Sequence, residues 1–67
     1  MSVAKVIELT ASSPKSFEDA VRTGIDRAEK TLDKVTGAWI SEQKVKVEGG
    51  KIKEYRVTMR VSFLLKD

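Results

Sequence analysis

The stretch SFEDAVRTGIDRAEKTLDKV, residues 16–35, decides the fold because its apolar residues recur at steps of three or four. This spacing places them on one side of a helix, as a stripe that faces the rest of the protein. The stripe consists of Phe17, Ala20, Val21, Gly24, Ile25, Ala28, Leu32 and Val35. Glycine costs a helix about 1 kcal/mol relative to alanine, so Gly24 predicts a close crossing of the helix by a sheet.

The start of this helix can be placed at either of two serines. Ser13 stands before Pro14, which fits an N-cap followed by proline at the first helical position. Ser16 with Asp19 forms a pattern similar to a capping box and would start the helix one turn later. The sequence leaves both starts open.

Strands are predicted on both sides of the helix. Residues 3–10, VAKVIELT, are rich in β-formers and alternate, which indicates a first strand. After the helix, Gly49 and Gly50 accept positive φ and suit a tight turn between two strands. The strand after this turn has a clear apolar row, formed by Tyr55, Val57, Met59, Val61 and Phe63. The strand before it changes parity, which predicts a bulge between Ser41 and Lys44.

These elements predict an α+β fold in a single domain, residues 1–67, with the order β-α-β-β. We expect a three-stranded antiparallel sheet wrapped around one helix, with the apolar row of the last strand against the helix. Strand alternation then places Arg56, Thr58, Arg60 and Trp39 on the opposite face of the sheet. We call this the outer face.

The composition indicates a globular chain with a small hydrophobic core. Of the 67 residues, 40% are hydrophobic and 34% are charged, as in soluble domains. One helix on a small sheet barely offsets the entropy of ordering such a chain. There is no cysteine or histidine for a disulfide or a structural zinc site, so oligomerisation is the expected source of further stability.

Charge and hydropathy predict the partners and the location. Thirteen basic and ten acidic residues give a net charge of +3, spread along the chain, so nucleic-acid binding is not expected. No apolar stretch approaches membrane-spanning length, and the first residues do not resemble a secretion signal. We therefore expect a cytoplasmic protein without membrane contact.

An enzyme is not expected, because neither histidine nor cysteine is present to build a nucleophilic site. Glu18 and Asp19 are explained by the start of the helix, where carboxylates are favourable. A metal remains conceivable, but no spaced acidic loop identifies its ligands. Glu29 and Asp33 are interpreted as part of a solvated helix surface.

Trp39 is the only tryptophan in the sequence and the main candidate for a functional residue. An exposed indole beside arginines serves either as an anchor between subunits or as a stacking platform for a planar anionic ligand. The sequence leaves these two roles open.

The chain also resembles the dodecins, small proteins that assemble as hollow dodecamers and commonly bind flavins. The resemblance covers nearly the whole length. It rests on KVIELTASSPKSFEDAV before and into the helix, on IDRAEKTLDKV along it, and on EYRVTMRVSFLL in the last strand. It implies the same fold and a homododecamer.

The resemblance also implies where a ligand would bind. In flavin-binding dodecins a tryptophan at the start of the second strand stacks on the isoalloxazine ring, and a glutamine of the last strand hydrogen-bonds it. These positions fall on Gly37 and Arg56, so both residues are replaced here. Trp39 keeps the same face but is displaced by about 6.6 Å, at ~3.3 Å per residue. Arg56 offers donors only, which favours phosphate or carboxylate.

The leading hypothesis is therefore a dodecin-like homododecamer that binds and stores a small planar ligand. Flavin, as FMN or riboflavin, is the ligand that the resemblance implies, held by Trp39, Arg56 and Gly37 with weakened affinity. The alternative is a shell that binds no flavin and has a structural or calcium-associated role. A nucleic-acid-binding module is the third hypothesis, and it would need the outer-face arginines to stay exposed after assembly.

Overall fold

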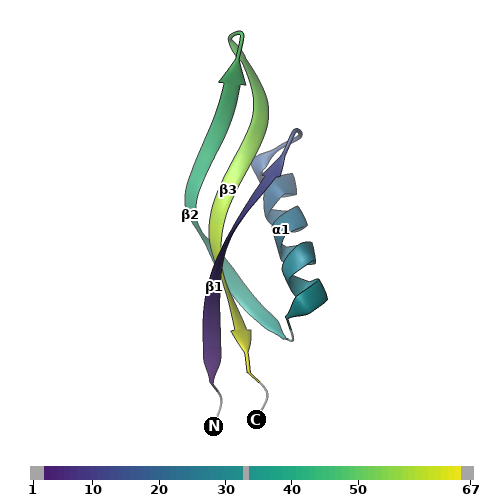
Figure 1. The fold of residues 1–67 in the computed structure, drawn as a ribbon, viewed down its shortest axis with the longest axis vertical. Coiled ribbons are helices and arrows are strands. Elements are labelled where there is room, and N and C mark those ends of the chain that lie inside the picture. The colour runs from purple at the N-terminus through teal and green to yellow at the C-terminus, as the bar shows by residue number, and fades with distance from the viewer. Residues whose placement is uncertain (1–2, 33, 66–67) are drawn as a thin grey trace.

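The computed structural model describes residues 3–32 and 34–65 and shows one helix against a three-stranded antiparallel sheet (Figure 1). The elements follow in the order β1 (Ala4–Ser13), α1 (Phe17–Thr31), β2 (Val35–Glu48) and β3 (Lys51–Leu64). The strand order in the sheet is β1-β3-β2, so β3 is the central strand. The predicted β-α-β-β order and the three-stranded sheet are confirmed.

The helix starts at the later of the two predicted positions. Ser16 is the N-cap, and its hydroxyl accepts a hydrogen bond from the Asp19 backbone N–H at 3.0 Å. Ser13 instead ends β1, where its buried hydroxyl donates to Asp19 Oδ2 at 2.6 Å and accepts from the Lys15 N–H at 2.9 Å. A start at Ser13 and Pro14 is therefore wrong, because Ser13 is still part of strand β1 and Pro14 lies in the bend that precedes the helix.

The helix also ends earlier than its apolar stripe suggests. Thr31 is its last residue and Leu32 is the C-cap, while Val35 already belongs to β2. Leu32 and Val35 still pack against the core, which explains why they continue the stripe. Glu29 is exposed, as predicted, and Asp33 lies outside the described residues.

Replacing Ser16 by alanine is expected to lower the free energy of unfolding by about 1 kcal/mol, because the Asp19 N–H loses its acceptor. Urea denaturation at a fixed protein concentration measures the change. A matched Ser16→Asp variant keeps an acceptor and should stay near wild type. Equal losses in both variants would contradict this role of the cap.

The core lies between α1 and the inward row of β3. Its buried residues are Ala20, Ala28, Val57, Met59, Val61 and Phe63. Gly24 is the point of closest approach, as predicted. A Cβ atom placed there would overlap Met59 Cε and lie 3.1 Å from Ala11 Cβ. The helix can therefore approach the sheet only because residue 24 has no side chain.

The hairpin between β2 and β3 has the predicted glycine turn and more irregularity than predicted. Gly49 and Gly50 have φ of 58° and 76°, which a tight turn between twisted strands requires. The predicted bulge is present at Ser41, where the pairing passes from Ile40 to Glu42. Further register shifts leave Thr36 of β2 and Lys53 of β3 unpaired.

The molecule is elongated, 52 × 19 × 13 Å, because the hairpin extends well beyond the helix (Figure 1). The helix packs on β1 and β3 and barely reaches β2. Ile40, Val47 and Ile52 of the hairpin are consequently exposed. No helix in the described part of the chain has the length and apolar character to cross a membrane.

Candidate ligand-binding face

The outer face of the sheet consists of the residues of β3 that alternate with the buried row, together with their neighbours on β1 and β2. Along β3 these residues are Arg56, Thr58, Arg60 and Ser62. Their partners on β2 are Lys44, Glu42, Trp39 and Gly37, respectively. The prediction that Trp39 lies on the face opposite the helix is confirmed.

Trp39 forms one end of a row of three side chains across the sheet. It lies directly opposite Arg60, whose guanidinium carbon is 6.0 Å from the centre of the indole ring. Arg60 in turn pairs with Glu8 of β1, with Nε 3.7 Å from the carboxylate oxygen Oε2. A cation therefore lies beside the indole. The indole is 48% exposed, so much of the ring remains open to a ligand or a partner.

Gly37 lies on the same face as Trp39 and opens space beside it. It is paired with Ser62, and a Cβ atom at this position would meet only Ser62 Oγ, at 3.6 Å. The Ser62 hydroxyl donates to the Gly37 carbonyl at 3.2 Å, which holds the two strands together. No register shift falls between Gly37 and Trp39, so both point to the outer face, as the period of two predicts.

Arg56 does not lie beside Trp39. It is four residues along β3 from Arg60, the partner of Trp39, which is about 13 Å at ~3.3 Å per residue. Its cross-strand neighbour is Lys44. Arg56 Nη2 donates to Glu54 Oε2 at 2.7 Å, and this ion pair fixes the direction of the guanidinium.

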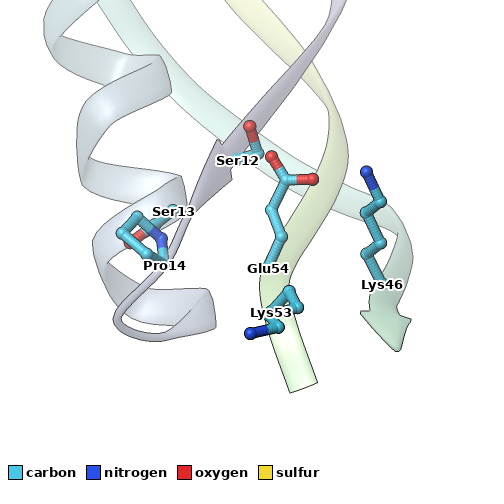
Figure 2. A pocket seen from close by; sticks show the side chains of 6 residues that line it. All are labelled: Ser12, Ser13, Pro14, Lys46, Lys53 and Glu54. Atoms are coloured by element: carbon cyan, nitrogen blue, oxygen red, sulfur yellow. The ribbon is translucent and has the colours of Figure 1, made fainter. Parts of the chain in front are cut away.

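Glu54 connects the three strands at this end of the face. The hydrogen bond from Arg56 holds the pKa of the Glu54 carboxyl below its ordinary value, and the Ser12 hydroxyl and the Lys46 charge act in the same direction. Glu54 lies between Ser12 of β1 and Lys46 of β2 (Figure 2). These three residues help to line a hollow of about 280 Å³. Glu54 is therefore ionised at neutral pH and offsets one of the nearby cations.

Two further hollows border Lys44 and Arg56. One, of about 430 Å³, is lined by Glu42, Gln43, Lys44, Arg56 and Thr58. The other, of about 250 Å³, is lined by Lys44, Lys46 and Arg56 alone. Within residues 3–32 and 34–65, no three acidic, histidine or cysteine side chains come together in a way that would hold a metal ion. The cationic lining of the smaller hollow and the exposed indole of Trp39 favour anion binding and stacking.

A search of family models matches residues 3–66 of this chain to the dodecin family. The chain is a dodecin family member. Calcium dodecin of Mycobacterium tuberculosis is 39% identical over 67 residues, which cover 98% of this chain and 93% of that protein. The family match therefore confirms the resemblance to the dodecins that the sequence of the helix and the last strand indicates.

Solved dodecin structures have the same fold. A mutant of the Thermus thermophilus dodecin superposes with a TM-score of 0.95 at 30% identity, over 100% of both chains. The dodecin of Streptomyces davaonensis has a TM-score of 0.94 at 30% identity, covering 98% of this chain and 97% of the other. The calcium dodecin structure from M. tuberculosis, described as having a novel calcium-binding site, has a TM-score of 0.84 at 37% identity, over 96% and 91%.

Of the three predicted ligand-binding residues, the dodecin fold brings two together. Gly37 and Trp39 are neighbours on the outer face, whereas Arg56 belongs to a second cluster with Lys44 and Glu54. Alternation predicts Arg60 on this face, but only the register of β2 against β3 reveals that it faces Trp39. Cross-strand pairing is thus the signal that sequence reasoning lacked.

Proposed function

We propose that this dodecin assembles with copies of itself, as a cytoplasmic homododecamer, and binds a small planar ligand on its outer face. The observation that carries the proposal is the exposure of Trp39 beside Arg60 and Gly37. A large ring held open to solvent, with a cation at one side and space at the other, suits stacking of a planar molecule. The role is binding and storage rather than catalysis.

Self-association is supported by the surface that the helix leaves uncovered. Ile40, Val47 and Ile52 are exposed on the hairpin, in a chain whose buried core is small. Covering this apolar surface with another copy would supply the burial that a domain of this size lacks. The assembly would also bring several outer faces together, so that neighbouring subunits complete each ligand site.

The ligand that we propose first is a flavin, FMN or riboflavin, because flavins are what the family resemblance implies. The proposed site contains Trp39 for stacking, Gly37 for space beside the ring, and Arg56 at a distance for the polar end of the ligand. Trp39 and Arg56 stand in for a differently placed tryptophan and a glutamine, so we expect weaker binding than in dodecins that have the usual pair.

The alternative is a dodecin shell that binds no flavin and has a structural or calcium-associated role. It is supported by the 39% identity to the calcium dodecin of M. tuberculosis. Because the described residues include no cluster of three acidic side chains within one chain, such a calcium site would use backbone carbonyls or carboxylates from several copies.

Titration of riboflavin with the assembled protein tests the proposal. Wild type should quench riboflavin fluorescence at micromolar concentrations, and Trp39→Ala should weaken binding about tenfold or more, because stacking on an aromatic ring contributes roughly 1–3 kcal/mol. A Trp39→Phe variant keeps a ring and should retain part of the affinity.

Native mass spectrometry of each variant separates loss of the ligand contact from loss of assembly. An intact Trp39→Ala assembly that binds riboflavin as tightly as wild type would contradict the role of the indole. An intact wild-type assembly that does not quench riboflavin, but carries bound calcium by elemental analysis, would favour the alternative.

A further inference from the structure

A pair of hydroxyl groups lies on the outer face beside the Trp39 and Arg60 pair. On β3, Ser62 follows Arg60 by two residues and so lies on the same face. Its partner on β2 is Gly37, which precedes Trp39 by two residues. The register shift just before Gly37 leaves Thr36 unpaired, and Thr36 Oγ1 lies 3.1 Å from Ser62 Oγ. Thr36 and Gly37 are consecutive, and this bulge is the reason that both lie on the outer face.

Both hydroxyl hydrogens of this pair have acceptors within the protein. Ser62 Oγ donates to the Gly37 carbonyl at 3.2 Å, and Thr36 Oγ1 donates to the Ser62 carbonyl at 3.3 Å. A hydroxyl has one hydrogen but two acceptor positions. The pair therefore offers mainly acceptor positions to a further molecule. The group that it suits is a hydrogen-bond donor, such as an N–H group at the edge of a ring.

Gly37 leaves the hydroxyl pair accessible to a ligand. A Cβ atom at residue 37 would lie 3.6 Å from Ser62 Oγ, so a larger side chain there would extend over the hydroxyl. Thr36 and Gly37 are exposed, and Ser62 is half-buried. Ser62 is about 6.6 Å along β3 from Arg60, at ~3.3 Å per residue. A ligand of two or three fused rings that stacks on Trp39 can therefore reach the pair with its edge.

We propose that the Thr36 and Ser62 hydroxyl pair accepts a hydrogen bond from a ring N–H of the ligand that stacks on Trp39. The pair thereby selects, among planar molecules, those that carry a hydrogen-bond donor at the ring edge. A ring without the donor would cover the hydroxyl oxygens without pairing with them, and an acceptor that loses water without gaining a partner costs free energy. This inference rests on the proposed stacking at Trp39 and adds the edge chemistry of the ligand.

Riboflavin and 3-methylriboflavin are the matched probes of this selection. They differ only at position 3 of the ring system, where a methyl group replaces the hydrogen of the N–H. Wild type should bind riboflavin about three- to tenfold more tightly than the methylated form, which is the range that one hydrogen bond contributes. Fluorescence titration of the assembled protein with each flavin measures the two affinities.

The double variant Thr36→Val with Ser62→Ala removes both hydroxyls. Its affinity for riboflavin should fall to that for 3-methylriboflavin, which should stay within about twofold of wild type. If the double variant does not assemble, the two single variants make the same comparison, and at least one of them should lose the preference. Thr31→Val is the matched control, because it removes an exposed hydroxyl that bonds the Ala28 carbonyl on the helix. It should keep the full preference.

The affinity that changes distinguishes a hydrogen bond from a steric effect. If the variants keep their riboflavin affinity and bind 3-methylriboflavin more tightly, the wild-type preference comes from a clash with the methyl group, and the proposal is wrong. Equal wild-type affinities for the two flavins, both dependent on Trp39, would also overturn it while leaving the stacking intact. If wild type binds neither flavin, the stacking proposal fails and the selection by the hydroxyl pair fails with it.

Discussion

Truncation of Met59 to alanine is expected to lower the free energy of unfolding by about 2–5 kcal/mol. Met59 is fully buried in the middle of β3, and its terminal methyl group lies where a side chain at Gly24 would have to be. Removing it leaves a cavity where helix and sheet are closest. A domain of this size has only about 3–5 kcal/mol from its own core, so the isolated fold would be largely lost.

Chemical denaturation monitored by circular dichroism measures this loss, at one protomer concentration because assembly contributes to the apparent stability. Met59→Leu nearly conserves the volume and should cost less than about 1.5 kcal/mol. If Met59→Ala and Met59→Leu had the same stability, the cavity explanation would be wrong.

Replacement of Gly24 by leucine is expected to destabilise the fold by at least about 2 kcal/mol, at the upper end of what overpacking costs. Even the first added atom would overlap Met59 Cε and come within 3.2 Å of Leu9 Cδ1. The helix would have to move away from β1 and β3. Thr23→Leu adds the same side chain at the adjacent exposed position and should stay within about 0.5 kcal/mol of wild type.

A double variant links these two predictions. In Gly24→Ala combined with Met59→Ala, the new methyl group occupies part of the space that the methionine leaves. The loss of stability should therefore be smaller than the sum of the two single losses, with a coupling energy of about 0.5–3 kcal/mol. Strict additivity would show that the two residues do not share this contact.

The fold was predictable where a local sequence pattern carries the signal. The period of the helix, the alternation of β3 and the paired glycines of the turn each reflect a preference that holds before any tertiary contact forms. The candidate site was predictable only in part. Alternation places Trp39 and Gly37 on one face, but bulges at Thr36, Ser41 and Lys53 decide which residues lie opposite them.

The amino-acid sequence by itself determined which residues face the helix and which face away, because the periods of 3.6 and 2 are properties of the backbone. Tertiary structure decided the rest. It ended the helix at Thr31 and started it after Ser16, and it paired Trp39 with Arg60 while placing Arg56 with Lys44. Cross-strand neighbours depend on the register and on each inserted residue, and these result from packing across the whole sheet.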